Sequence, residues 1–182
     1  MMDNAQVARL FVAIRPPGIV RNALLGAMGG IEGARWQDDE QLHLTLAFVG
    51  EADRAQSAAL FEALAGVESE AFAAEVSGVG HFERKGRPAA VWARVPLTEP
   101  LAQLQRRVER ACRQAGFGAE KRGYRPHITL ARLPRSAGPV GPWLAEHGTL
   151  RVGPWQVAGF TVYESHLRPE GSHYAPLVDF ES

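Results

Sequence analysis

The sequence predicts an α+β domain of two pseudo-symmetric lobes, each an antiparallel sheet with outer helices, arranged around a central cleft. Three observations support this prediction. Short β-rich apolar runs alternate with amphipathic helical segments, these segments recur in a similar order in both halves of the chain, and each half contains one strand of the pattern His-x-Thr. Because the chain has 182 residues and no long Pro, Gly or Ser-rich linker, we expect one domain over residues 1–182.

The composition is that of an ordinary globular protein, with 46% hydrophobic and 22% charged residues. The 20 basic and 20 acidic residues cancel, so no global field attracts nucleic acid and anion binding must come from local patches. The single cysteine, Cys112, excludes an internal disulfide and a Cys-based zinc site. No apolar run is long enough to span a bilayer and no secretion signal is recognisable, so we predict a cytoplasmic protein without membrane contact.

The first half of the chain is expected to alternate strand and helix. Prolines stop the first strand and a Gly-Gly pair ends the first helix. Asp53 can cap the second helix, in which apolar side chains form one stripe. The expected elements are a strand at 9–17, a helix at 18–30, a strand at 42–49 punctuated by Gly50, and a helix from Asp53 to Gly66.

The second half contains the clearest helix of the chain. Thr98 is its expected N-cap, Pro100 lies in its first turn, and Gly116 closes it. Its apolar stripe consists of Leu101, Leu104, Val108, Ala111 and Cys112. The remaining expected elements are strands at 71–82 and 89–95 joined by a polar turn, a strand at 126–133, a loop at 134–142, and the last strands within 150–167 and 173–180.

The two His-x-Thr strands, "HLTLAFV" and "HITLAR", carry the main functional signal. Side chains alternate faces along a strand, so His43 and Thr45 share one face while the intervening leucines point to the other. His127 and Thr129, 84 residues after the first pair, have the same arrangement. Burying such groups without partners costs about 1–3 kcal/mol each, so we expect both pairs to face a polar cleft.

A pair of histidines at one site suits acid–base catalysis near neutral pH, because one imidazole can take a proton while the other gives one. Threonine hydroxyls beside them can donate to the non-bridging oxygens of a phosphate. This set meets the needs of phosphodiester cleavage. That scheme requires no metal, and no carboxylate cluster or HExxH-type spacing accompanies either histidine, so no metal site and no cofactor is predicted.

Positive charge gathers around the second pair. Five basic residues and no acidic residue lie between positions 121 and 135, namely Lys121, Arg122, Arg125, Arg132 and Arg135. In a regular strand Arg132 has the opposite parity to His127, so a bend or strand end is needed to bring it to the site. Phe48, Tyr124 and Arg125 are candidate RNA contacts, although aromatic residues near strands more often belong to the core.

The segments "RLFVAI", "HLTLAFVG", "F…VWARV", "RPHITLAR" and the closing Ser165, Gly171 and Tyr174 extend over nearly the whole chain. In this order they resemble the 2H phosphoesterase superfamily, and specifically its bacterial and archaeal RNA 2′,3′-cyclic phosphodiesterases, the ThpR/LigT-like proteins. The resemblance implies the bilobal 2H-phosphoesterase-like fold. It also implies metal-independent hydrolysis of RNA 2′,3′-cyclic phosphate ends to 2′-phosphomonoesters, with reversible 2′–5′ RNA ligation as a related reaction.

Carried over to this chain, the resemblance makes His43 the proton donor to the departing 3′-oxygen and His127 the proton acceptor that activates water. Thr45, Thr129 and Arg132 would bind the phosphate. The near-symmetry of the two motifs gives no independent basis for choosing which histidine is the acid. The implied partner is RNA with 2′,3′-cyclic phosphate ends, tRNA fragments being one candidate, and no obligate protein partner is evident.

Two further functions remain open from the sequence. The same chemistry would serve a 2′–5′ oligonucleotide or small cyclic-nucleotide phosphodiesterase. A non-catalytic RNA-end-binding protein could use the same groove, although binding alone would be better served by Arg and Lys than by paired histidines.

Overall fold

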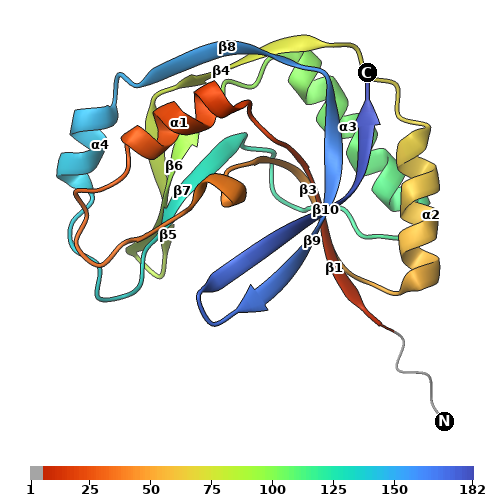
Figure 1. Ribbon diagram of the computed structural model, residues 1–182, viewed down its shortest axis with the longest axis horizontal. Helices are drawn as coiled ribbons and strands as arrows, with labels where there is room; N and C mark the ends of the chain where they lie inside the picture. Colours follow the sequence, from red (N-terminus) through yellow and green to blue (C-terminus); the bar gives the residue numbers. More distant parts are fainter. Residues whose placement is uncertain (1–5) are drawn as a thin grey trace.

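The computed structural model describes residues 6–182, which form two four-stranded sheets, one two-stranded sheet and four α-helices (Figure 1). The strands are β1 (Ala8–Ile14), β2 (Arg35–Trp36), β3 (Leu44–Ala52), β4 (Phe72–Ser77), β5 (Val79–Arg84), β6 (Arg87–Arg94), β7 (His127–Arg132), β8 (Arg151–Val157), β9 (Gly159–Arg168) and β10 (Gly171–Glu181). The helices are α1 (Gly18–Gly26), α2 (Arg54–Ala65), α3 (Glu99–Gln114) and α4 (Gly141–His147), with a 3₁₀ turn η1 (Asp39–Gln41).

The two motif strands lie in different antiparallel sheets, which confirms the predicted α+β fold class. The first sheet has the order β10-β9-β1-β3 and ends at motif strand β3, and the second has the order β2-β7-β6-β5 and contains motif strand β7. Counted from the motif strand, the first sheet continues with β1 and then β9, and the second sheet continues with β6 and then β5. The first sheet is built from both ends of the chain, since β9 and β10 join β1 and β3 in it, and the expected internal duplication stays a prediction.

One hydrophobic core joins the two motif strands. As predicted, Leu42, Leu44 and Leu46 of the first motif are buried in it, and Ile128 and Leu130 of the second motif pack into the same cluster. The alternation of apolar and polar residues therefore leaves the histidines and threonines on the opposite face of each sheet. We call this face, which carries the His and Thr side chains, the motif face of that sheet.

The predicted N-cap residues of α2 and α3 and the predicted apolar stripe of α3 are found in the structure. Asp53 accepts a hydrogen bond from the Gln56 backbone N–H, and Gln56 accepts one from the Asp53 backbone N–H, so a complete capping box opens α2. Thr98 is the N-cap of α3, although its side chain makes no capping hydrogen bond. The whole predicted apolar stripe of α3 is buried, Cys112 included. Both α2 and α3 pack against β3 and lie at one end of the molecule, with α4 at the other (Figure 1).

Glycine ends elements less reliably than predicted. Gly50 does not end the first motif strand: β3 continues to Ala52, and Gly50, with φ of +89°, follows an extra residue, Val49, in the register against β1. Conversely, Gly78 divides the expected strand at 71–82 into β4, which pairs with β8, and β5, which pairs with β6. Its φ of +84° turns the chain from one sheet into another.

One helix lies partly in a segment predicted to be a loop. Residues 134–142 are rich in Gly and Pro, but α4 begins at Gly141 because Pro142 is suited to a first helical turn. Trp143 is almost fully buried, and its indole N–H donates to the Ala27 carbonyl at 3.0 Å, which anchors this short helix. None of the helices within residues 6–182 has the length and apolar character needed to cross a bilayer.

Candidate active site

Each of the two motif histidines is held by a hydrogen bond of the same kind, from its Nδ1 to a nearby backbone carbonyl. His43 immediately precedes β3 and its Nδ1 lies 2.7 Å from the Gln41 carbonyl oxygen, while His127 opens β7 and its Nδ1 lies 2.7 Å from the Arg125 carbonyl oxygen. In both cases the acceptor is two residues earlier in the chain. Because a carbonyl can only accept, each Nδ1 carries the proton, and each neutral imidazole leaves the lone pair of Nε2 available to a substrate.

A β-bulge at the same place in both motifs shapes the two motif faces. The register of β3 against β1 skips Leu46, and the register of β7 against β6 skips Leu130. Both leucines and the alanines that follow them pack towards the core. The bulge therefore returns the fifth residue after each histidine to the motif face, which places Phe48 in the first motif and Arg132 in the second at equivalent positions.

This bulge supplies the bend that Arg132 requires to reach the site. The side chain of Arg132 is exposed and forms no ion pair with another residue in 6–182. It lies near enough to His43 for its positive charge to contribute to the lowered pKa of that imidazole. The charge of His127 acts on His43 in the same way, and the two motif strands β3 and β7 contact each other although they belong to different sheets.

Side chains from the second half of the chain fasten the free edge of β3. The Tyr124 hydroxyl donates to the Thr45 carbonyl at 2.8 Å, and buried Gln105 of α3 approaches the Leu46 carbonyl at 3.5 Å. These carbonyls have no strand partner on that side because β3 is the last strand of its sheet. Tyr124 is thus half-buried and links the two motifs through this hydrogen bond, and its role as an RNA contact stays a prediction.

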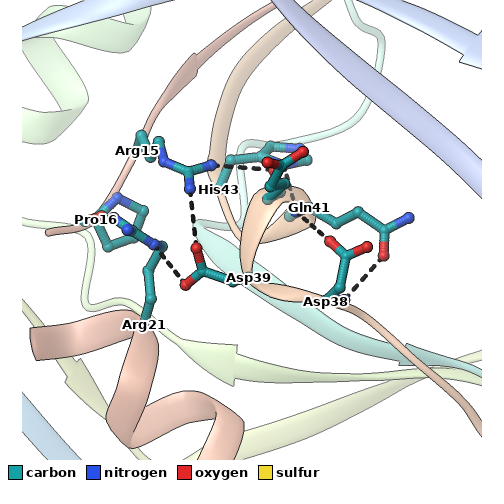
Figure 2. A network of polar contacts seen from close by, with 8 residues as sticks. Arg15, Pro16, Arg21, Asp38, Asp39, Gln41 and His43 are labelled. Carbon is teal, nitrogen blue, oxygen red and sulfur yellow. Dashed lines mark hydrogen bonds and ion pairs between the residues drawn. The ribbon is translucent and has the colours of Figure 1, made fainter. Parts of the chain in front are cut away.

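A network of charged groups supports the turn before His43 (Figure 2). The Asp39 carboxylate accepts from Arg21 Nε at 2.9 Å and from an Arg15 guanidinium nitrogen at 3.3 Å, and Arg15 also donates to the Glu40 carbonyl at 3.0 Å. The hydrogen bond from Arg21 lowers the pKa of Asp39, so this group is a carboxylate at neutral pH. The turn so held ends at Gln41, the residue whose carbonyl orients His43.

Gln41 is itself fixed on both sides. Its backbone N–H donates to the Asp38 side chain in a capping box, and its side-chain amide donates to the Ser172 carbonyl of β10 at 2.7 Å. Sequence reasoning missed this support. The acidic run at residues 38–40 was a visible signal beside the motif, but its partners Arg15 and Arg21 could be assigned only from the fold.

Aromatic side chains surround both imidazoles. The ring centroid of His43 lies 4.8 Å from Phe11 and 5.0 Å from Tyr174. The ring centroid of His127 lies 4.8 Å from Phe82 and 5.7 Å from Trp92. Burial among these rings disfavours the charged imidazolium and lowers the pKa of both histidines, to about 4 for His43, against the opposing effect of the Nδ1 hydrogen bonds.

The remaining predicted site residues differ in their accessibility. Thr45 and Thr129 are half-buried on the motif faces, and neither hydroxyl has a hydrogen-bond partner among residues 6–182, so both can donate to a bound anion. Phe48 is 73% exposed and the Arg125 side chain is also exposed. Within the same residues, no group of three or more His, Cys, Asp or Glu side chains is arranged to hold a metal ion.

Proteins of known fold resemble this structure over almost its whole length. A crystal structure from Thermus thermophilus matches with a TM-score of 0.73 and 29% sequence identity, covering 97% of that chain and 95% of this one. Escherichia coli LigT in complex with 3′-AMP has a TM-score of 0.77 at 24% identity, covering 98% of LigT and 97% of this chain, which is a likeness of fold alone.

Sequence comparison gives the same family. The model of the 2′-5′ RNA ligase superfamily matches residues 31–168. The RNA 2′,3′-cyclic phosphodiesterase of Aeropyrum pernix is 34% identical over 80% of this chain and 84% of its own length. That of Archaeoglobus fulgidus is 30% identical over 95% of this chain and 99% of its own length. The chain therefore belongs to the 2′-5′ RNA ligase superfamily, in which its matched relatives are RNA 2′,3′-cyclic phosphodiesterases.

Proposed function

We propose that this protein is an RNA 2′,3′-cyclic phosphodiesterase that hydrolyses the cyclic end to a 2′-phosphomonoester by two-histidine acid–base catalysis. The observation that carries the proposal is the twin arrangement of His43 and His127. Each donates its Nδ1 proton to the carbonyl two residues earlier and leaves Nε2 free on neighbouring motif faces. The matched relatives bear the same activity in their names, which supports the choice of substrate.

In the proposed reaction a water oxygen attacks phosphorus while His127 Nε2 takes a proton from that water. The bond between phosphorus and the 3′-oxygen breaks, and His43 Nε2–H protonates the departing oxygen. The hydroxyl of Thr45 from one motif and that of Thr129 from the other bind the non-bridging oxygens, and the Arg132 guanidinium balances the negative charge. The water thus adds its OH to phosphorus and its proton, by exchange through the histidines, to the sugar.

The donor role of His43 requires the substrate to bring a change in protonation. In the free protein, burial keeps the pKa of His43 at about 4, below that of an ordinary histidine, so its imidazole is neutral near pH 7. An anionic phosphodiester next to Nε2 stabilises the imidazolium and raises this pKa. Binding therefore prepares His43 as an acid only when a substrate anion is present.

A second reaction follows from microscopic reversibility. The same groups acting in reverse would join a 5′-hydroxyl end to a 2′,3′-cyclic phosphate through a 2′–5′ bond. The matching superfamily is described as one of 2′-5′ RNA ligases, which favours ligation as the second candidate over cleavage of small cyclic nucleotides or RNA binding without catalysis. Ligation requires the 5′-hydroxyl oxygen to occupy the place of the attacking water.

The test is hydrolysis of a short RNA with a 2′,3′-cyclic phosphate end, with identification of the product phosphate as 2′ or 3′. His43→Ala and His127→Ala are each expected to lower kcat by about 10²- to 10⁴-fold. His166→Ala, an exposed histidine outside both motifs, is the matched control and should retain full activity. Full activity in either motif variant, or a preference for 3′,5′-cyclic nucleotides or 2′–5′ dinucleotides, would contradict the proposal.

A sulfur substitution separates the roles of the two histidines. A cyclic phosphorothiolate with sulfur at the 3′-position releases a thiolate, which needs no proton from the enzyme. This substrate is expected to restore most of the activity of His43→Ala and little of that of His127→Ala. The opposite pattern would exchange the acid and base roles while leaving the proposed activity intact.

A further inference from the structure

Two arginines lie directly opposite each other on the motif face of the second sheet. In the ladder of β2 and β7, Arg35 is the partner of Arg132 and Trp36 is the partner of Ala131. Trp36 and Ala131 both pack with the hydrophobic core, so they lie on the other face. Because side chains alternate along a strand and directly opposed residues share a face, Arg35 lies on the motif face beside Arg132.

Neither of these two guanidinium groups is neutralised by the protein. Both side chains are exposed, and neither forms an ion pair with another residue in 6–182. The Cβ atoms of directly opposed residues lie about 4.5–5.5 Å apart, and like charges at such positions lower the stability of the sheet. An anion bound beside the pair removes this repulsion, so the arrangement is suited to a protein with an anionic ligand at this place.

The reacting phosphate does not require both positive charges. A 2′,3′-cyclic phosphodiester has one negative charge, which Arg132 balances in the proposed reaction. Arg132 also lies near enough to His43 to lower the pKa of that imidazole, whereas Arg35 is not among the charges that do so. Arg35 belongs to β2, the outer strand of the sheet, and thus lies further from His43 than Arg132 does. Its charge is left for a second anion.

We propose that Arg35 binds the phosphate on the 5′-oxygen of the nucleotide that carries the cyclic end, which joins this nucleotide to the preceding one. The proposal rests on the proposed function and narrows its substrate class to an RNA end, as opposed to a mononucleoside cyclic phosphate. Along the RNA chain this is the phosphate next to the reacting one. A guanidinium can donate two N–H groups at once to phosphate oxygens, so Arg35 holds this phosphate while Arg132 holds the reacting phosphate.

Another exposed arginine on the same motif face offers an alternative path for the RNA. Arg94 of β6 is the partner of His127 in the ladder of β6 and β7. Burial lowers the pKa of His127, so near pH 7 the residue opposite Arg94 is a neutral imidazole rather than a second guanidinium. No like-charge repulsion at Arg94 therefore calls for an anion, which favours Arg35.

The experiment compares wild type and Arg35→Gln on three substrates. These are a dinucleotide with a 2′,3′-cyclic phosphate end, the same dinucleotide with an uncharged methylphosphonate between its nucleotides, and a nucleoside 2′,3′-cyclic phosphate. Arg35→Gln should raise KM for the first substrate about 5- to 20-fold and leave KM for the other two within about twofold. Arg35→Lys, which keeps the charge, should raise KM for the first substrate less than Arg35→Gln does.

Two controls accompany this comparison. Arg110→Gln replaces an exposed arginine of α3 that has no ion pair to another residue in 6–182, and it should change none of the three KM values. Added salt should raise the wild-type KM for the charged dinucleotide more than that for the methylphosphonate dinucleotide, because the contact joins two charges.

The outcomes separate this inference from the proposed function. Equal losses on all three substrates would mean that Arg35 acts on the reacting phosphate or on the fold, and no loss on any would mean that it does not contact the RNA. A selective loss in Arg94→Gln instead of Arg35→Gln would direct the RNA over β6. Each of these results overturns the inference while wild-type hydrolysis still supports the proposed function. Failure of the wild type to hydrolyse all three substrates would instead overturn the proposed function, on which this inference depends.

Discussion

The two halves of the candidate site use one local geometry in two different settings. Both imidazoles donate Nδ1–H to the carbonyl two residues earlier at 2.7 Å, and both motif strands carry a bulge three residues after the histidine. Around His43 the supporting turn is fixed by Asp39 and two arginines (Figure 2), and burial lowers the pKa of the imidazole to about 4. No comparable ion-pair network holds Arg125, the acceptor for His127, among residues 6–182.

This difference shows that a repeated motif need not give repeated chemistry. The His-x-Thr pattern fixes where each Nε2 points, whereas the surroundings decide how readily each imidazole holds a proton. His43 is the more strongly perturbed group, and the nearby positive charges of His127 and Arg132 add to the effect of burial. In the free protein, the first proton to bind the pair therefore resides mainly on His127.

The pH dependence of the reaction tests the difference in pKa between His43 and His127. Of the effects predicted below, this one is expected to be the largest. The active free enzyme carries one proton on the pair, so kcat/KM should fall as the pH drops through about 4 and also as it rises through the pKa of His127. Since the pKa of His127 is also lowered, the optimum of kcat/KM lies below the ordinary histidine pKa of about 6.5. On each limb the value should change about tenfold per pH unit.

The corresponding profile of kcat is expected at higher pH, because the bound phosphodiester anion stabilises the imidazolium form. Both profiles come from one series of initial rates with a 2′,3′-cyclic nucleotide between about pH 3 and 9. A kcat/KM profile that is flat over this range, or that peaks above pH 7, would remove the proposed asymmetry between the histidines.

Much of this arrangement could be predicted from the sequence, because alternation along a strand is a local property. Leu42, Leu44 and Leu46 are buried as the pattern requires, and His43 and Thr45 share the opposite face. The caps and apolar stripes of α2 and α3 are equally local, since each depends on residues a few positions apart. The fold class followed from these elements, and the family followed from the order of the motifs.

The features that could not be predicted depend on pairing between distant segments. A bulge is defined by the partner strand, so nothing in the residues around Leu130 indicates one there, and the position of Arg132 stayed unresolved without it. The link from Tyr124 to the Thr45 carbonyl joins residues 79 positions apart, and the ion pairs of Asp39 reach back to Arg15, just after the first strand, and to Arg21 of the first helix. Pairing of the chain's two ends in one sheet is a further property that periodicity does not contain.

Asp39→Asn is expected to loosen the turn that positions His43. Its effect on kcat should be smaller than that of the pH changes and larger than that of Tyr124→Phe. The amide keeps the shape of the carboxylate but loses the charge that draws Arg15 and Arg21 together, so the turn that presents the Gln41 carbonyl becomes less restrained. We expect kcat to fall about 10-fold with little change in KM, because misplacement of an acid–base group chiefly affects the chemical step. Steady-state kinetics with a 2′,3′-cyclic nucleotide measure both constants.

The control is Glu40→Gln, which removes a neighbouring exposed carboxylate with no ion pair to another residue in 6–182. It should leave kcat unchanged. Because Asp39 acts through His43, Asp39→Asn should have no further effect in a His43→Ala background and should retain its effect in a His127→Ala background. Equal effects in the two backgrounds would show that the network stabilises the fold generally rather than His43 in particular.

Tyr124→Phe is expected to have the smallest effect, and it tests the connection between the two halves rather than either half alone. Loss of the hydroxyl removes the 2.8 Å hydrogen bond to the Thr45 carbonyl while the ring still packs against the core. A single neutral hydrogen bond contributes about 1 kcal/mol net, so kcat should fall about 3- to 5-fold. Since the bond sets the position of one motif relative to the other, this loss should disappear in both the His43→Ala and the His127→Ala backgrounds, where only one imidazole remains to be positioned. Persistence of the loss in either background would mean that Tyr124 supports one motif locally and that the spacing between the histidines is maintained by the shared core.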